Sequence, residues 1–598
     1  MKLSNKHNVS TTDRRKRFSA LLSELFGQLS QRRRRQFVLF LCLMLLGAIA
    51  ELLSIGAVLP FLAVISNPER MVQQAQLHTS LATFGITTSI QLTIIVAVVF
   101  ALAVLFAAST RLLLAYVSHR FVFAISRDLS IAVFSRTLHQ PYSFHVSQNS
   151  NETLAAISKA QLVTEQLLIP LVQAATSSLI ATAILIGLLF IDPQMALISG
   201  VCFAATYLIV MRTTRAVMVA NGKIISQMQG ERLRAASEGL GGIRDVLLDG
   251  SQAVFVARFS AIEARLGSAA ALNNFIAQSP RFVVEGIGLV IVAGLTVLLS
   301  LRDGGLALAL PILGTLTLGA QRLLPVLQQA YNGWASTLTA GSMLADILDI
   351  LRLPEAPKVT AFGKDTDIAL TRDLEFSKVG LSYQHGTRPA LKCIDLLVPK
   401  GTRIGFVGRT GSGKSTLMDL ALGLLLPDEG RILVDGVELT GANRMSWQAR
   451  VAHVPQSIYL SDASIAENIA FGVPLHAIDR SRVEAAAAQA ELTEVIAALP
   501  NGYDTFVGER GVRLSGGQRQ RVGIARALYK KAEVLVFDEA TSALDTETEA
   551  AVMRAIEGLG RDLTIFIIAH RISTLGGCDL IFSLDEGRVV IDRLTVVE

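Results

Sequence analysis

Residues 403–415 read "RIGFVGRTGSGKS", and this stretch decides the fold of the second half of the chain. The apolar run "RIGFV" is short and bounded by turn residues, which predicts a buried strand. The following "GRTGSGKS" matches G-x-x-x-x-G-K-[ST], a loop whose backbone N–H groups surround the phosphates of a nucleotide. Lys414 would supply a cation to the β and γ phosphates, and the Ser415 hydroxyl would ligate Mg²⁺. A helix after the loop would direct its positive N-terminal end at the same anion.

The stretch therefore predicts an α/β nucleotide-binding domain of the P-loop type that holds ATP and Mg²⁺. The predicted nucleotide contacts are the loop and the start of the helix: Gly408, Arg409, Thr410, Gly411, Ser412, Gly413, Lys414, Ser415 and Thr416. A second apolar run, "VLVF" (534–537), ends in Asp538 and Glu539. Asp538 would hold Mg²⁺ through water, and Glu539 would act as the general base that polarises the attacking water.

The composition divides the 598-residue chain into a membrane half and a soluble half. Hydrophobic residues make up 51% and charged residues only 17%, which is too apolar for an ordinary soluble enzyme. Charged residues are sparse in the first half and return to normal density after about Leu353. Six apolar segments approach the roughly 20 residues that a membrane-spanning helix needs: about 37–65, 92–117, 167–190, 195–210, 282–300 and 306–328.

Basic residues orient these predicted spans. The clusters "DRRKRF" (13–18) and "QRRRRQ" (31–36) precede the first span, and the long segments 118–166 and 211–281 are also basic. By the positive-inside rule, the N-terminus, both long segments and the soluble half with the C-terminus are cytoplasmic. No nucleic-acid-binding module accompanies the arginines, so we expect no nucleic-acid partner.

The two long segments are too long for structureless loops and are expected to be helical hairpins. One would reverse at "HQPYSFH" (139–145) and the other at "GLGGIRD" (239–245). The predicted organisation is a bundle of six transmembrane helices followed by the α/β domain. Its predicted parts are a basic cytoplasmic segment (1–36), a transmembrane domain (37–330), a linker (331–370) and the nucleotide-binding domain (371–598).

One further motif points to a known family. "LSGGQRQR" (514–521) matches the signature sequence of ATP-binding cassette (ABC) proteins, and the chain resembles an ABC exporter of the half-transporter type over nearly its whole length. The resemblance implies that Ser515, Gly516, Gly517 and Gln518 meet the ATP held by the opposite subunit. A helix start offers the N–H donors that such a contact needs.

The resemblance also assigns roles to three single residues. Gln456 in "HVPQS" resembles the glutamine that senses Mg²⁺, and His570 in "IIAHR" the histidine that contacts the γ-phosphate. Tyr383 in "LSYQHG" resembles the aromatic residue that stacks on adenine. One chain carries one set of motifs and six spans, so two chains must pair. A homodimer is expected because Glu539 and the signature are both intact, and a heterodimer stays open.

Glu51 lies inside the first span, in "LGAIAELLSIGAVLP" (46–60), where a carboxylate costs about 2.5–3.5 kcal/mol on insertion scales. Counting 1.5 Å per residue from Phe37 puts it slightly past the midplane. The same count pairs Arg322 with Glu285 and leaves Arg111 too far from Glu51. Glu51 would then be protonated, hydrogen-bonded to hydroxyls such as those of Thr296 or Thr315, or, as we favour, solvated in a transport cavity; a buried structural carboxylate is the alternative.

Three spans resemble a subgroup of ABC exporters that flip lipid-linked oligosaccharides or export related glycoconjugates: "AELLSIGAVLPFL" (50–62), "PRFVVEGIG" (280–288) and "AQRLLPVLQQAYN" (320–332). The resemblance implies a flippase of the bacterial inner membrane whose substrate has an anionic lipid–pyrophosphate head and a sugar chain. Glu51, Arg111 and Arg322 are the candidate substrate residues, since basic side chains near the inner leaflet suit such a head group. A drug or peptide exporter and an ATP-gated channel are the alternatives.

Overall fold

A computed structural model describes most of the chain: residues 11–66, 88–147, 150–191, 193–300, 305–354, 367–383, 389–538, 556, 558, 560–569 and 575–590. Of some helical residues, among them 306–320, it describes the backbone only. The chain forms two compact units that divide after residue 356, and residues 141–146 group with the second unit.

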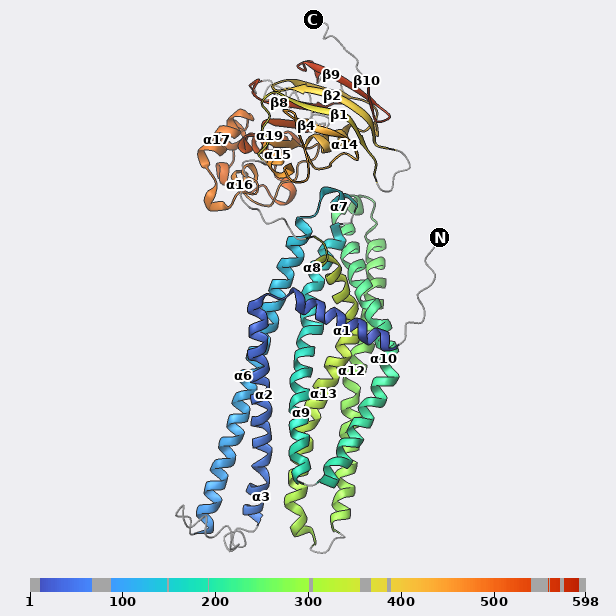
Figure 1. Cartoon of the computed structure of the whole chain (residues 1–598), viewed down its shortest axis with the longest axis vertical. Helices are drawn as coiled ribbons and strands as arrows, with labels where there is room; N and C mark the ends of the chain where they lie inside the picture. The colour runs from blue at the N-terminus through green and yellow to red at the C-terminus, as the bar shows by residue number, and fades with distance from the viewer. Residues whose placement is uncertain are drawn as a thin grey trace. The chain divides into compact units, whose positions relative to one another are not determined.

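The described part of the first unit is entirely helical, and its long helices α9, α10, α12 and α13 run side by side (Figure 1). Its elements are α1 (Thr11–Gln28), α2 (Gln31–Gly56), α3 (Val58–Ser66), α6 (Ser89–Leu138), α8 (Ser150–Val163), the π-helix η1 (Thr164–Leu168), α9 (Ile169–Ile191), α10 (Pro193–Gly241), α11 (Ile243–Leu248), α12 (Gln252–Ser300) and α13 (Gly305–Leu351).

Four described helical segments are long and apolar enough to cross a membrane: Gln31–Ile65, Ser89–Leu138, Leu154–Phe190 and Phe203–Gly241. The fifth and sixth predicted spans lie on α12 and α13. With 50 residues, α6 is about 75 Å long, more than twice the roughly 30 Å of a bilayer core. It therefore continues well beyond a membrane, and the same holds for α10, α12 and α13.

The helical hairpins are confirmed. The first reverses through the short helix α7 (Tyr142–Ser147), and the second reverses around α11 after the helix end at Gly241. The predicted linker is wrong in its first part, because residues 331–351 belong to α13. These residues are apolar enough to pack: Met343, Leu344 and Ile347 are fully buried.

Helices α2 and α6 form an antiparallel pair with a constant register. The rings of Phe40 and Phe121 stack with their centroids 5.8 Å apart. Gly47 lies one heptad after Phe40 on α2, and Leu114 lies one heptad before Phe121 on α6. A Cβ at Gly47 would lie 3.4 Å from Leu114 Cδ2. This register brings later residues of α2 to earlier residues of α6, among them the charged residue Glu51.

The described residues of the second unit form two sheets. The smaller is antiparallel, in the order β2-β1-β4-β5, and the larger has the order β10-β9-β3-β8-β7-β6 with parallel pairing from β9 through β6. The strands are β1 (Asp373–Leu381), β2 (Leu391–Pro399), β3 (Arg403–Val407), β4 (Glu429–Val434), β5 (Val437–Glu438), β6 (Val451–Val454), β7 (Val534–Asp538), β8 (Thr564–Ile568), β9 (Leu580–Asp585) and β10 (Arg588–Val590).

Among its described residues, two hydrophobic cores support this unit. One lies between the two sheets and helix α14, with Phe376, Phe406 and Trp447 fully buried, and the other surrounds helix α19. The helices are α14 (Lys414–Ala421), α15 (Arg444–Arg450), α16 (Ile465–Ile469), α17 (Arg480–Gln489), α18 (Thr493–Ala497) and α19 (Gly516–Lys530), with short 3₁₀ turns η3 (Leu475–Ala477), η4 (Gly502–Asp504) and η5 (Glu509–Gly511).

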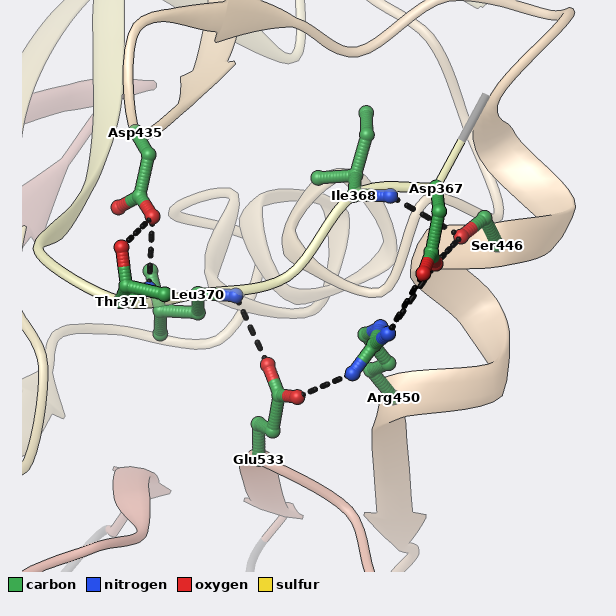
Figure 2. A network of polar contacts seen from close by, with 8 residues as sticks. All are labelled: Asp367, Ile368, Leu370, Thr371, Asp435, Ser446, Arg450 and Glu533. Atoms are coloured by element: carbon green, nitrogen blue, oxygen red, sulfur yellow. Dashed lines mark hydrogen bonds and ion pairs between the residues drawn. The ribbon is translucent and has the colours of Figure 1, made fainter. Parts of the chain in front are cut away.

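A network of hydrogen bonds and ion pairs connects residues 367–372, which lead into β1, to the rest of the second unit (Figure 2). Arg450 lies between two carboxylates, with Nη1 2.5 Å from Glu533 and Nη2 3.1 Å from Asp367. Glu533 also accepts a hydrogen bond from the backbone N–H of Leu370 at 2.8 Å. Asp435 accepts three backbone N–H bonds, from residues 371–373, and one from the Thr371 hydroxyl. Burial would raise the pKa of Asp435, but these hydrogen bonds outweigh it and lower the pKa to about 2.

Candidate functional site

The parallel pairing places four chain segments at one edge of the larger sheet. Strands β3, β8, β7 and β6 all run in the same direction, so their carboxyl ends meet there, where open α/β sheets bind ligands. The phosphate loop follows β3, and Asp538 is the last residue of β7. Ile568 of β8 is in register with both Phe406 of β3 and Asp538. Gln456 follows the end of β6 by two residues.

The backbone of the phosphate loop requires glycine. Gly408, Gly411 and Gly413 have φ of 149°, 82° and 104°, a region that side chains rarely allow. A Cβ at Gly408 would lie 2.3 Å from the carbonyl oxygen of Leu584, and one at Gly413 would lie 2.8 Å from that of Ala390. The loop is therefore enclosed by its neighbours, and no larger residue fits at these two positions.

Two polar side chains of the loop suit a phosphate. Lys414 is 6% exposed, and its ammonium donates hydrogen bonds to the carbonyls of Gly408 (2.7 Å) and Arg409 (3.0 Å), across the concave side of the loop. The Ser412 hydroxyl is buried and has no hydrogen-bond partner among the described residues. A buried polar atom without a partner is costly, and a phosphate oxygen would satisfy it. The loop thus fits the triphosphate that its sequence predicts.

Tyr383 lies beside this loop, as the predicted adenine contact must. Its hydroxyl is 3.3 Å from that of Thr416 on α14, and its ring is 42% exposed. Tyr142 of α7 lies in the same neighbourhood: burial and the nearby Asp419 and Tyr383 raise its pKa. Tyr142, which groups with the second unit, therefore lies close to the predicted adenine position.

Asp419 is a residue of this site that sequence reasoning missed. Burial, and next the charge of Asp538, raise its pKa to about 6. It lies on α14, one turn beyond the loop-facing start of the helix. The sequence does contain a signal for Asp419: an acidic residue follows the phosphate-binding Lys414 by only five positions. Such a carboxylate near Asp538 adds negative charge at the place where Mg²⁺ is expected.

The signature motif forms the start of α19. Ser515 is its N-cap: the Ser515 hydroxyl accepts from Gln518 N (3.2 Å), and Gln518 Oε1 accepts from Ser515 N (2.9 Å). Ser515 and Gly516 are exposed, whereas Gly517 is buried. Gln518 and Ser515 therefore cap the start of α19. The residues Ser515 and Gly516 remain accessible to solvent. An exposed helix start of this kind suits an anion.

Part of the predicted site lies outside the described residues. Glu539 and His570 are among these, so their roles stay predictions. Strand β7 ends at Asp538 and β8 ends at Ile568. The described strands thus stop one residue before Glu539 and two before His570, at the edge of the sheet where the phosphate loop begins.

A second cluster of charges lies among the helices of the first unit. Glu51 of α2 is 2% exposed, and its Oε1 accepts a hydrogen bond from Arg322 Nη1 of α13 at 2.9 Å. Its Oε2 lies 3.5 Å from Nε of Arg111 on α6. The same Arg322 Nη1 donates to the hydroxyl of the fully buried Ser54 at 2.8 Å. Glu51, Arg111 and Arg322 therefore each have a partner of opposite charge, as the desolvation of charges among membrane-spanning helices demands.

This cluster corrects the predicted pairing. The prediction that Arg111 lies out of reach of Glu51 is wrong, and so is the prediction that Arg322 pairs with Glu285. Glu285 is exposed on α12 and has no ion pair with another described residue. The depth count failed because contacts between long helices depend on their register and tilt, not on distance from an apparent membrane edge. The side chains of Thr296 and Thr315 lie outside the described residues.

A cavity of about 900 Å³ lies between α1, α9, α10 and α13. Its wall includes Leu171 and Trp334, with Arg215 and Lys223 two turns apart on α10. Glu51 does not line it and is almost inaccessible. Solvation in a cavity, the favoured prediction for Glu51, is therefore replaced by ion pairing with two arginines.

A nucleotide-binding domain with a phosphate loop and a signature helix, attached to helices that can cross a membrane, defines an ATP-driven membrane transporter. The sequence profile of the ABC transporter family matches residues 391–542. The ATP-dependent lipid A-core flippase of Cupriavidus pinatubonensis is 32% identical over 496 residues, which are 80% of this chain and 80% of that protein. The ATP-dependent lipid A-core flippase of Chromohalobacter salexigens is 38% identical over 371 residues, 61% of this chain and 62% of that protein.

A solved structure of a bacterial Atm1-family ABC exporter with ATP bound is similar along almost the whole chain. It has a TM-score of 0.73 and 26% identity, and the match covers 93% of this chain and 94% of that one. The chain belongs to the ABC transporter family, as an exporter-type half-transporter. It binds ATP and couples ATP hydrolysis to translocation, and its fold is the one predicted from the sequence.

Proposed function

We propose that two copies of this chain use MgATP hydrolysis to flip an anionic lipid-linked saccharide out of the cytoplasmic leaflet of a bacterial inner membrane, with both termini cytoplasmic. The observation that carries the choice of substrate is the cluster of Glu51, Arg111 and Arg322. It holds one negative and two positive charges, so it keeps a net positive charge at membrane-spanning helices. An anionic head group is the ligand that such a charge favours.

Two further observations support an amphipathic lipid. The cavity between α1, α9, α10 and α13 combines apolar walls with Arg215 and Lys223, a pairing of surfaces that suits acyl chains and an anionic group. The relatives from Cupriavidus pinatubonensis and Chromohalobacter salexigens are both named lipid A-core flippases. The saccharide on the lipid is inferred from this likeness.

In the proposed ATPase cycle, Lys414 and the loop N–H groups bind the β and γ phosphates, and Tyr383 stacks on adenine. Ser415, Gln456 and Asp538 would hold Mg²⁺, which neutralises charge on the phosphates when bound. Glu539 takes the proton of the attacking water, and His570 orients the γ-phosphate. Since Ser515 and Gly516 are exposed on the α19 side of the domain, they are available to a second subunit's ATP. A homodimer would then contain two composite sites.

Mass spectrometry of lipids tests the substrate directly. The Glu539→Gln protein is purified without nucleotide, and its bound lipids are compared with those of the same protein carrying Arg111→Gln and Arg322→Gln. We expect an anionic, saccharide-bearing lipid that is enriched over the membrane extract and depleted by the two substitutions. Equal recovery of neutral phospholipids from both proteins would contradict the proposal.

A further inference from the structure

The least accessible member of the charge cluster contacts both of the others. The side chain of Glu51 is 2% exposed, whereas that of Arg322 is 26% and that of Arg111 is 46% exposed. The carboxylate therefore lies behind the two guanidinium groups, on the inner side of the cluster. A ligand that approaches the cluster meets arginine first and does not need to touch Glu51.

The two arginines are held unequally. Arg322 donates from Nη1 to both Glu51 Oε1 and Ser54 Oγ, so its position is fixed by two hydrogen bonds. Arg111 faces Glu51 Oε2 at 3.5 Å, and that oxygen has no hydrogen bond from a described residue. Arg111 is therefore attracted by charge without being locked in place. A guanidinium has five donors, so both arginines keep donors for another acceptor.

Such a pair of guanidinium groups suits a phosphate. Arginine recognises phosphate oxygens through two parallel N–H bonds, and a phosphomonoester offers more negative charge and one more terminal oxygen than the phosphodiester of a zwitterionic head group. The cluster of Glu51, Arg111 and Arg322 carries a net charge of +1, and this charge attracts an anion. Without Glu51, the net charge of the two arginines would be +2.

We propose that Glu51 is a positioning residue that exchanges Arg111 with the phosphate of the transported lipid. In the absence of substrate, Arg111 pairs with the Glu51 carboxylate. When the lipid binds, Arg111 pairs with its phosphate instead, and it pairs with Glu51 again when the lipid leaves. Glu51 thereby limits how tightly the head group is held and allows its release. This inference rests on the proposed function, because it assumes an anionic lipid as substrate.

Glu51→Gln separates this role from a structural one. The glutamine oxygen can still accept from Arg322, but the negative charge that attracts Arg111 is gone. We define the half-stimulating fraction as the fraction of anionic lipid in the membrane that gives half of the maximal ATPase stimulation. One additional net positive charge on the cluster should lower this fraction about tenfold. The maximal stimulated ATPase rate should fall as well, because the head group is released more slowly. Glu51→Asp keeps the charge and should stay closer to the wild type in both values.

The compensating variant is Glu51→Gln combined with Arg111→Gln. It restores a net charge of one on Arg322, so the half-stimulating fraction should return toward the wild-type value. If Glu51 only supports the fold, the two substitutions should instead add their defects. Thermal unfolding of each purified variant records any loss of stability separately from the kinetic values.

The experiment measures ATPase activity in nanodiscs of phosphatidylcholine that contain increasing fractions of phosphatidic acid, a phosphomonoester lipid. We expect stimulation of the wild type by phosphatidic acid, a lower half-stimulating fraction and lower maximum for Glu51→Gln, and partial reversal in the double variant. A stimulated wild type with an unchanged half-stimulating fraction in Glu51→Gln would overturn the role of Glu51 alone. A wild type indifferent to phosphatidic acid would overturn the anionic-lipid proposal together with this inference.

Discussion

Arg322 Nη1 lies 2.9 Å from Glu51 Oε1, and this ion pair joins α13 to α2 within the membrane-spanning helices. Residues far apart in the sequence thus fix the packing of the first and sixth predicted spans. A charge of either sign at this place is stable only with its partner. The pair therefore contributes to the fold as well as to the proposed head-group site.

Removal of Arg322 should destabilise the helical unit. Arg322→Gln leaves the buried Glu51 with Arg111 alone, at 3.5 Å. We expect a loss of about 2 kcal/mol, less than the roughly 3–5 kcal/mol for a fully buried pair, because Arg322 is 26% exposed. Thermal unfolding of the purified protein in detergent measures the change. Arg212→Gln, on an exposed arginine of α10, is the matched control and should leave the midpoint unchanged.

Lys414→Ala should abolish tight ATP binding. The ammonium lies across the concave side of the loop, and no other described side chain of the loop supplies a cation there except the exposed Arg409. We expect the dissociation constant for ATP to rise at least about tenfold, in line with the loss of a charge-assisted contact of roughly 1.5–3 kcal/mol. Equilibrium binding of a fluorescent ATP analogue measures it. Lys400→Ala changes an exposed lysine of the same domain and serves as control; equal affinity of the two variants would refute the role of Lys414.

Mixed dimers test whether each site combines two chains. When one chain carries Lys414→Ala and its partner carries Ser515→Arg, both defects fall on one composite site and the other stays intact. When one chain carries both substitutions beside a wild-type chain, each site has one defect. We expect clearly more ATP hydrolysis from the first dimer than from the second, measured on dimers purified with two different affinity tags. The same rate in both arrangements would contradict composite sites.

Asp419 should make the stability of the nucleotide-binding domain depend on pH. Burial and the charge of Asp538 raise its pKa to about 6, above the ordinary value near 4. The stabilising contribution is complete below pH 4 and is lost as the pH rises through 6. Asp419→Asn should therefore be more stable than the wild type at pH 8, by about 1 kcal/mol after allowance for partial exposure, and no more stable at pH 4.

Fluorescence of the buried Trp447 during thermal unfolding reports on this domain, provided that Trp334 is replaced by Phe. Asp562→Asn removes an exposed carboxylate of the same domain and should show no such dependence on pH. A stability gain for Asp419→Asn that is equal at both pH values would show that its charge is not the cause.

The sequence was sufficient for the parts of the fold that local chemistry determines. The phosphate loop after β3 and the signature helix start at Ser515 follow from residues adjacent in the chain, and the structure forms both. Both hairpin reversals were also predictable, because Pro141 and Gly241 interrupt otherwise continuous helical patterns. These signals need no knowledge of distant partners.

The charge cluster could not be predicted in the same way. Its geometry depends on the register between α2 and α6, shown by the stacking of Phe40 on Phe121, and on the approach of α13. A count of residues from the edge of an apolar run carries no information about register or tilt. Asp419 was missed for a related reason: its proximity to Asp538 arises from the pairing of β3, β8 and β7, which lie far apart in the sequence.

Coupled movement of lipid is the central claim, and periodate protection tests it most directly. The protein is reconstituted into liposomes made from bacterial inner-membrane lipid that contains anionic glycolipids, and only outward-facing nucleotide-binding domains can use added MgATP. Periodate does not cross the bilayer and oxidises the sugars of lipids in the outer leaflet only. We predict that MgATP increases the protected fraction of anionic glycolipid with the wild type and not with Glu539→Gln, which should lose at least about 10²-fold in hydrolysis. ATP hydrolysis by the wild type without any increase in protection, or an equal increase with Glu539→Gln, would contradict an ATP-driven flippase.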